Sequence, residues 1–183
     1  MPSARFKLVV AVMSVLTVAT YVAEPILVPN ASAARSPAPD FSLATIDGST
    51  FRLSDRPNGS LVLLDFMATW CFPCRQQLQD LREIRAEVPP AALMIVSIDE
   101  EYSIDSASVA RFRAAYGGIN GSMEGSRWYF AADTVEEHVG LKYGVTALPT
   151  VVLIDADGAV ARTWFGSVSS ATLVQAIAAE LRA

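Results

Sequence analysis

The sequence has too few metal-binding side chains to complete a structural zinc site. Only two of its 183 residues are cysteine and one, His138, is histidine, whereas a structural zinc ion takes four ligands that are usually Cys or His. Basic residues are also scarce: 14 Lys and Arg stand against 19 Asp and Glu, which gives a net charge of −5. This acidity argues against nucleic acid as a partner. Internal repeats and low-complexity segments are absent too, so the length fits one domain plus an N-terminal appendage.

Both cysteines lie in one short motif, Trp70-Cys71-Phe72-Pro73-Cys74. The motif follows an apolar run, Leu61 to Phe66, and begins a segment with a helical pattern. A dithiol with this spacing at a strand-to-helix junction is typical of thiol–disulfide exchange. Cys71 is the expected nucleophile, because a helix N-terminus stabilises a thiolate, and Cys74 is the expected resolving thiol. The alternative is an inert structural disulfide, which would close a very short loop and stabilise the fold little.

The N-terminal segment has the pattern of an export signal. Arg5 and Lys7 precede an uncharged apolar stretch, Leu8 to Ala23, and Ala31-Ser32-Ala33-Ala34 is similar to a signal peptidase site. The apolar stretch is somewhat shorter than the about 20 residues of a membrane-spanning helix. We therefore expect residues 1–33 to be either a cleaved signal peptide or a retained membrane anchor, with a buried hairpin of the fold as the third interpretation.

Export has a consequence for the dithiol. Residues 34–39 are expected to form a short stiff linker and residues 40–183 the folded domain, in the periplasm or cell envelope. The cytoplasmic thiol pools do not keep thiols reduced there. A lone dithiol in that compartment therefore depends on a dedicated partner.

The remaining pattern predicts an α/β layer architecture with the order β-α-β-α-β-β-α after an N-terminal hairpin. Turn signals are Asp47-Gly48, Asn58-Gly59 and Asp157-Gly158. The expected strands are 41–45, 51–53, 61–66, 93–98, 151–154 and 160–165. The expected helices are one after Cys71 that Pro89-Pro90 ends, one capped by Ser106 that runs through Tyr116, one capped by Asp133 with Gly144 as its stop, and one from Ser169 or Ser170 that carries Leu173, Val174, Ile177 and Leu181.

This order resembles the thioredoxin fold, with the dithiol after the first core strand and Leu148-Pro149-Thr150 opening the third. Residues 65–71, Asp-Phe-Met-Ala-Thr-Trp-Cys, match the thioredoxin signature position by position. From about Pro39 to the C-terminus the chain is similar to the extracytoplasmic TlpA/ResA-type thiol–disulfide oxidoreductases. Those proteins share a leading hairpin and an insertion between the second core strand and second core helix, here about Glu100 to Ala132.

The resemblance implies a thioredoxin-like fold and a protein thiol–disulfide oxidoreductase. It implies reduction of protein disulfides, with cytochrome c maturation as one setting. The implied partners are client proteins with disulfides or thiols and a membrane thiol electron donor. No cofactor is expected beyond the redox-active Cys71–Cys74 disulfide, no metal is expected, and the protein is expected to be a monomer. Membrane association would come through the N-terminus.

The chain departs from this group at two acidic positions. The group often carries Glu three residues after the second cysteine, where this chain has Gln77, and Asn where this chain has Asp65. Asp65 instead matches the buried aspartate of cytoplasmic thioredoxins, so it becomes the candidate base for Cys74. A carboxyl in an apolar strand should have a raised pKa. The alternative is a strand-end residue that reaches solvent or caps the turn.

Five further residues are expected to shape the site. By resemblance, Pro149 is cis, faces the cysteines and exposes the backbone of Leu148 to a substrate chain; the alternative is an ordinary proline at a strand start. Trp70 and Phe72 are expected to form apolar walls for substrate, and Pro73 fits the first helical turn.

Two other functions remain open on the same fold. Copper-delivery proteins of the Sco type use two cysteines three residues apart and a ligand histidine near the position of Pro149. Here the spacing is two, and His138 lies in a predicted helix, where it is expected to be solvated or half-packed. The second alternative is a disulfide-forming oxidant or isomerase. Phe72-Pro73 places no charge or histidine between the sulfurs to stabilise a thiolate, which favours a reductant.

Overall fold

The computed structural model describes residues 35–102, 104–117 and 125–183. The predicted signal peptide or anchor, residues 1–33, lies outside them. Within the described part of the chain, no helix combines the length and the apolar character needed to cross a membrane.

A five-stranded mixed sheet forms the centre of the domain, in the order β5-β4-β3-β6-β7. Its strands are β3 (Leu61–Met67), β4 (Leu93–Asp99), β5 (Trp128–Ala132), β6 (Thr150–Ile154) and β7 (Val160–Phe165). β3 pairs in parallel with β4 and antiparallel with β6, and all seven of its residues are buried. A central strand covered on both faces must be apolar throughout, which explains the run from Leu61 to Phe66.

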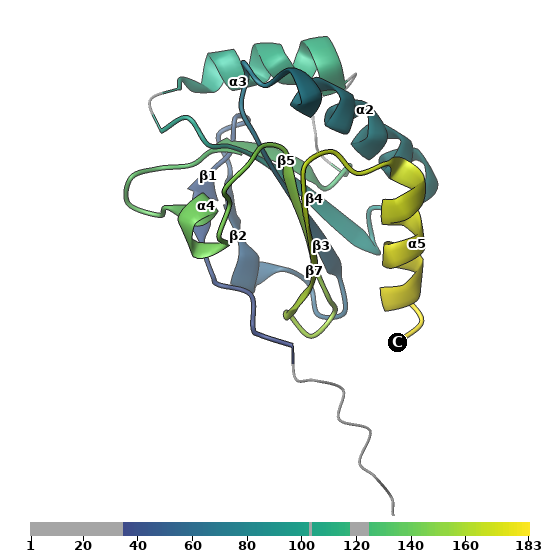
Figure 1. The fold of residues 1–183 in the computed structure, drawn as a ribbon. Coiled ribbons are helices and arrows are strands. Elements are labelled where there is room, and N and C mark those ends of the chain that lie inside the picture. The colour runs from purple at the N-terminus through teal and green to yellow at the C-terminus, as the bar shows by residue number, and fades with distance from the viewer. Residues whose placement is uncertain (1–34, 103, 118–124) are drawn as a thin grey trace, which may run out of the picture. The chain divides into compact units, whose positions relative to one another are not determined.

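Helices and a hairpin cover the two faces of this sheet (Figure 1). The apolar residues of α2 (Phe72–Glu87), α3 (Ser106–Phe112) and α5 (Ser170–Glu180) pack on one face, and those of α4 (Val139–Lys142) and the hairpin β1–β2 pack on the other. β1 (Ser42–Ala44) and β2 (Thr50–Arg52) pair as antiparallel strands. The structure also has two short helical turns, η1 (Leu53–Asp55) and the π-helical η2 (Arg113–Gly117). This arrangement confirms the predicted α/β thioredoxin-like class with its N-terminal hairpin.

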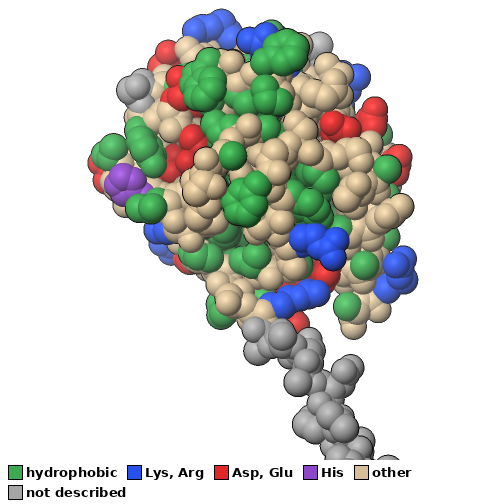
Figure 2. Space-filling view, in the orientation of Figure 1, with side chains coloured by type: hydrophobic (Ala, Val, Ile, Leu, Met, Phe, Trp, Pro, Cys, Tyr) green, Lys and Arg blue, Asp and Glu red, His purple; other side chains and the backbone are tan. Residues whose placement is uncertain are grey.

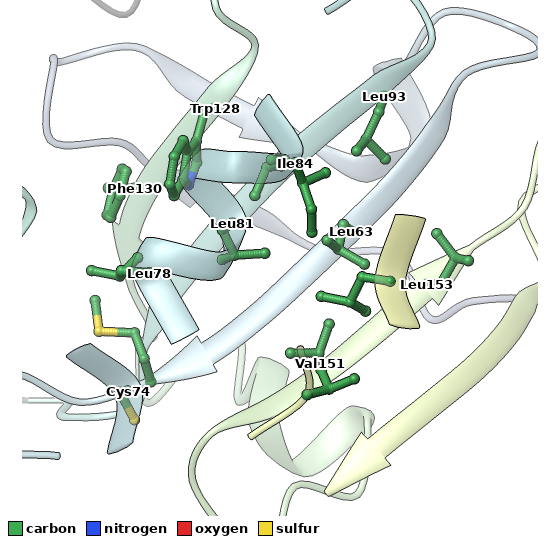
Figure 3. Close-up of a cluster of buried hydrophobic side chains, with 14 of the residues drawn as sticks. Leu63, Cys74, Leu78, Leu81, Ile84, Leu93, Trp128, Phe130, Val151 and Leu153 are labelled. Carbon is green, nitrogen blue, oxygen red and sulfur yellow. The ribbon is translucent and has the colours of Figure 1, made fainter. Parts of the chain in front are cut away.

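The layer between α2 and the sheet holds the larger part of the core (Figure 3). Leu78, Leu81 and Ile84 of α2 face the sheet and Cys74 lies at one end of the same cluster. The sheet contributes Leu63 from β3, Leu93 from β4, Trp128 and Phe130 from β5, and Val151 and Leu153 from β6. The predicted apolar face of the helix is therefore the face that packs, and it places the dithiol at the end of the core.

β5 was not predicted as a strand and lies inside the expected insertion. It pairs in parallel with β4, with Ile95 opposite Trp128 and Asp99 opposite Ala132. The aromatic run at its start is a strand signal. Its position as the edge of the sheet also explains why the hairpin reaches it, through a bridge between Thr45 and Ala131.

The predicted helix over residues 133–144 was wrong in most of its length. Only Val139–Lys142 is helical, and His138 precedes it in the left-handed region with φ 46°. Instead of starting a helix, the Asp133 carboxylate accepts bonds from the backbone N–H groups of Thr134 and Gly140, at 2.7 and 3.0 Å. The chain folds around a buried carboxylate, and these hydrogen bonds within the loop outweigh the pattern of a helix cap at Asp133.

The helix that follows β4 starts as expected but has a different cap. Asp105 precedes it, and the Asp105 carboxylate accepts a bond of 2.9 Å from the Ser108 N–H. Ser106, the expected cap, is the first helical residue. The helix changes to a π-helical turn at Arg113.

Residues 35–39, expected to form a linker, are bonded to the domain. Arg35 forms ion pairs with Asp155 and with Glu180, at 3.1 and 2.6 Å. The Ala38 N–H donates to the carbonyl oxygen of Gly158 at 2.9 Å. This segment therefore runs along the β6–β7 turn and reaches the end of α5.

Candidate active site

The two cysteines form a disulfide at the start of α2. Cys71 is the N-cap residue, and its sulfur accepts a bond of 3.2 Å from the backbone N–H of Cys74. The helix that follows is 16 residues long, so its unpaired first amides and its dipole favour negative charge at Cys71 after reduction. Pro73 lies in the first helical turn, where no intrahelical bond needs its missing N–H.

A pocket of about 410 Å³ opens beside Cys71. Its lining includes Trp70, Cys71, Phe72 and Pro73 from the motif, Glu100 from the end of β4, and Val145, Thr146, Ala147 and Leu148 from the loop before β6. Trp70 and Phe72 are 67% and 78% exposed. Cys71 is 3% exposed but lines the pocket, whereas Cys74 is fully buried and does not line it. An incoming chain would therefore meet Cys71 between two aromatic side chains, and would not reach Cys74.

The loop before β6 is held in place by two hydrogen bonds. The Leu148–Pro149 peptide bond is cis, as the resemblance implied. The Gly166 N–H donates to the carbonyl oxygen of Pro149 at 2.8 Å, and the Thr150 hydroxyl donates to that of Ala147 at 2.7 Å. These bonds fix Leu148 in the wall of the pocket, and Pro149 follows it directly before β6.

Asp65 is fully buried in β3. Leu63 and Met67, two residues away on either side, belong to the core layer that contains Cys74. Because side chains alternate between the faces of a strand, Asp65 points into this same layer. Burial raises the pKa of its carboxyl to about 7. Asp65 does not reach solvent as a strand-end residue would, and its part in proton transfer stays a prediction.

A short hydrogen-bond chain holds one side of this carboxyl. The Ser97 hydroxyl donates to Asp65 Oδ2 at 2.9 Å, and Trp128 Nε1 donates to Ser97 Oγ at 3.1 Å. The bond from Ser97 lowers the pKa of Asp65 and so opposes the effect of burial. The other oxygen, Oδ1, has no hydrogen-bond partner among the described residues, which leaves it available to exchange a proton.

Gln77 occupies the position where the resembling proteins often carry Glu, and its side chain is fully buried. Its amide nitrogen donates to the carbonyl oxygen of Val168 at 3.1 Å, and its amide oxygen accepts from the Val168 N–H at 2.9 Å. Gln77 therefore joins α2 to the segment before α5 and offers no acid to the dithiol.

Glu100 is the site residue that sequence reasoning missed. It directly follows β4, and its backbone N–H donates to the carbonyl oxygen of Met67 at 2.9 Å, so it lies at the same sheet edge as the motif. Burial, and then the nearby carboxylates of Asp133 and Asp99, raise the pKa of its carboxyl to about 8. The signal was present in the sequence, because the carboxyl ends of neighbouring parallel strands meet at one edge of a sheet.

The next residue, Glu101, supports the motif from the same edge. Its carboxylate accepts from the backbone N–H and the hydroxyl of Thr69, at 3.2 and 2.8 Å. Thr69 is two residues before Cys71, so this carboxylate fixes the approach to the dithiol.

Comparisons with known proteins agree with this geometry. The sequence profile of the AhpC/TSA family matches residues 34–163. The thiol–disulfide oxidoreductase ResA of Bacillus thuringiensis (strain Al Hakam) is 30% identical over 129 residues, which cover 70% of this chain and 68% of that protein. The thioredoxin-like protein YneN of Bacillus subtilis (strain 168) is 28% identical over 138 residues, 75% of each chain.

A solved structure shows the same fold. The thiol:disulfide interchange protein of the thioredoxin family from Chlorobium tepidum TLS superposes with a TM-score of 0.67 at 25% identity, over 81% of this chain and 98% of that one. Fold, dithiol and relatives together define a thioredoxin-fold thiol–disulfide oxidoreductase, as the sequence predicted. By its matching profile, the chain belongs to the AhpC/TSA family.

Proposed function

We propose that this protein is an exported reductant of disulfides in client proteins. The observation that carries the proposal is the unequal placement of the two cysteines: Cys71 caps α2, is 3% exposed and lines the pocket, whereas Cys74 is fully buried and is not among the lining residues. That asymmetry suits a nucleophile that meets the client and a second thiol that acts only within the protein.

The reaction has two exchange steps. The Cys71 thiolate attacks one sulfur of the client disulfide; the client S–S bond breaks and a mixed disulfide with Cys71 forms. Cys74 then gives its proton to a base, for which Asp65 is the candidate, and its thiolate attacks the Cys71 sulfur. The Cys71–Cys74 disulfide forms and the client leaves as a dithiol. Two electrons and two protons pass from the protein to the client.

The two residues between the sulfurs support electron transfer from the protein to the client. Strong oxidants of this kind owe their potential to a stabilised reduced form, and Phe72-Pro73 adds no charged or histidine donor to stabilise a thiolate. The couple should therefore be reducing, and a membrane thiol donor would have to recharge it. Clients would be exported proteins with oxidised cysteines, the haem-binding thiols of cytochromes c among them. The protein would act as a monomer in the periplasm or cell envelope, anchored by residues 1–33 or released after cleavage near Ala33.

Equilibration of the purified protein with glutathione redox buffers tests this direction. We expect a potential near that of thioredoxin, about −270 mV, measured as the fraction of oxidised protein after acid quenching and thiol labelling. A disulfide that is reduced readily by mildly reducing glutathione would instead identify an oxidant or isomerase.

Metal analysis with a disulfide reductase assay tests the class of activity. The proposal expects turnover of a protein disulfide by the metal-depleted protein, with Cys71→Ser as the inactive control. Stoichiometric copper without turnover would favour a copper-delivery function, since soft thiolates bind Cu(I).

A further inference from the structure

The dithiol pocket contains one carboxyl side chain among its described lining residues, that of Glu100. The rest of the described lining, apart from Cys71 and the hydroxyl of Thr146, is aromatic or aliphatic. The Oε1 atom of Glu100 is buried and has no hydrogen-bond partner in the described structure. A buried carboxyl oxygen without a hydrogen-bond partner is costly, above all when the group is ionised, so a positive charge nearby would stabilise the ionised form.

No described Lys or Arg forms an ion pair with this carboxyl. Lys142, on α4, is paired with Glu137 at 2.7 Å. The guanidinium of Arg75 lies over two aromatic rings, 5.8 Å from the ring centre of Phe72 and 4.9 Å from that of Tyr116. Lys142 is thus paired outside the pocket, and Arg75 lies against the Phe72 and Tyr116 rings without an ion pair to Glu100.

The acidic groups around Glu100 add to the excess of negative charge near its carboxyl. Asp99 comes from β4 and Asp133 from the segment after β5, and both raise the pKa of Glu100. From the loop after β4, the Tyr102 phenol has a raised pKa, owing to burial and then to Asp133 and Glu100. On the side of α4, His138 contacts Tyr102. In Figure 2 acidic side chains lie between hydrophobic ones on the side of the molecule that carries the histidine.

Two aromatic rings complete the chemistry of the pocket. Trp70 and Phe72 line it and are largely exposed. An aromatic face attracts a cation through its quadrupole, most strongly for Trp. A carboxylate with exposed aromatic walls is a combination that binds a Lys or Arg side chain by its charge and its aliphatic stem.

We propose that Glu100 makes the pocket selective for client segments that carry a cationic side chain directly beside the reacting cysteine. This inference rests on the proposed function, since it takes the pocket as the place where the client segment lies. The client cation occupies the space between Glu100 and the aromatic walls while its neighbouring cysteine reaches Cys71.

Gly140 accounts for the position of the Glu100 carboxyl. A Cβ atom at residue 140 would collide with the carboxyl group of Glu100, so glycine provides the space in which that group lies. The raised pKa adds a pH dependence: the carboxyl is largely neutral below pH 8 and ionised above it. A cation that enters stabilises the ionised form, so cation binding lowers the pKa and releases a proton.

Paired peptide disulfides test the selectivity. One peptide carries Lys on both sides of the reacting cysteine, and the other carries norleucine, which keeps the apolar stem without the charge. We expect the protein to reduce the Lys peptide about fivefold faster at pH 9, and to show a ratio near one at pH 6. The ratio of the two rates at each pH cancels the titration of Cys71, which is common to both reactions.

The variant Glu100→Gln keeps the size of the side chain and removes its charge. We expect the ratio to fall to about one at every pH, and because each ratio compares two peptides on the same variant, a change in the overall rate of Glu100→Gln does not affect it. Glu136→Gln is the matched control, because it removes the same charge from an exposed residue outside the pocket lining, and it should keep the fivefold ratio. A ratio of one in the unmodified protein, or a ratio that survives in Glu100→Gln, would overturn the proposal.

Peptides with Ser in place of Cys separate this inference from the proposed function. Their binding to the disulfide form, followed by NMR titration, needs no redox chemistry. Tighter binding of the Lys peptide that is lost in Glu100→Gln supports the selectivity even if neither disulfide peptide is reduced, an outcome that would contradict the proposed function alone. Equal binding of both Ser peptides counts against the selectivity, whatever the turnover.

Discussion

Both polar ends of the Gln77 amide are hydrogen-bonded to the backbone of one residue, Val168. The two residues are 91 positions apart in the sequence. A neutral amide can donate to the Val168 carbonyl and accept from its N–H at once, whereas an ionised carboxylate can only accept. The residue at the position that often holds an acid in the TlpA/ResA-type proteins therefore makes a structural contact in this chain.

Gln77→Glu should destabilise the fold at pH 8. An ionised carboxylate at this position would leave the Val168 carbonyl without a donor and bury a charge, at a cost of roughly 2 kcal/mol. The loss should shrink at pH 5, because the protonated acid can donate to that carbonyl. Denaturant unfolding at both pH values measures it. Gln76→Glu, at an exposed position of the same helix, is the control and should change stability by less than about 0.5 kcal/mol.

The two cysteine variants should behave differently toward clients. Cys74→Ser leaves the nucleophile in the pocket but removes the resolving thiol, so mixed disulfides should accumulate. Cys71→Ser leaves only the enclosed sulfur, which clients do not reach. Non-reducing gels of each variant after incubation with a disulfide-bonded client measure the adducts. Equal trapping by both variants would refute the assignment of roles.

Asp65→Asn should stabilise the protein at neutral pH and slow its catalysis. The unfolded state loses the Asp65 proton near pH 3.8 and the folded state near pH 7, so burial of this residue weakens the fold progressively between those values and by a constant amount above them. Asn does not titrate. The gain should be small at pH 4 and reach roughly 2–4 kcal/mol above pH 7, measured by denaturant unfolding of both disulfide forms.

The rate at which the mixed disulfide is resolved tests whether Asp65 acts as the base for Cys74. With its candidate base removed, Asp65→Asn should release a trapped client more slowly, while attack by Cys71 keeps its rate. Single-turnover kinetics separates the two steps. Unchanged release would show that Asp65 is a structural residue only.

Ser97→Ala should raise the pKa of Asp65 above about 7. The Ser97 hydroxyl bond favours the ionised carboxylate, and its loss leaves desolvation unopposed. NMR titration of the Asp65 carboxyl measures the shift. Because Ser97 also accepts from Trp128, an accompanying loss of stability of about 1–2 kcal/mol is expected. A lowered pKa would contradict this account of the carboxyl.

Gly140→Ala should displace the Glu100 carboxyl with little cost in stability. The new Cβ would meet only the end of a flexible side chain, so the carboxyl can move toward solvent, and its pKa should fall from about 8 toward its ordinary value of 4.5. NMR titration of Glu100 checks this. Gly144→Ala is the control: its Cβ would meet nothing within 4 Å, and its strain comes only from φ +66°, so the pKa of Glu100 should not change.

Much of the site could be predicted because its parts are close in sequence. Cys71 and Cys74 are one helical turn apart, so their pairing and their place at a helix start depend on local structure. Asp65 was a candidate because a carboxyl in an apolar run must be buried if the run is a central strand. Leu148 and Pro149 came from the resemblance, and not from physical pattern.

The missed features depend on contacts that local helix and strand propensities do not predict. Asp133 has the pattern of a helix cap, but its carboxylate is enclosed by its own loop. β5 is a short strand whose stability comes from pairing with β4. Local propensity decides neither case, because packing and buried hydrogen bonds outweigh it.

The sequence by itself determined the Cys71–Cys74 dithiol, the order of most helices and strands, and the buried position of Asp65, since each follows from spacing or periodicity. Only the tertiary structure decided which side chains surround that group. Glu100 reaches the pocket because β4 lies beside β3 in parallel, and the Gln77 amide is hydrogen-bonded at both ends because Val168 lies against α2. A residue's neighbours across a sheet or between helices are set by the packing of the whole chain, and no local pattern contains them.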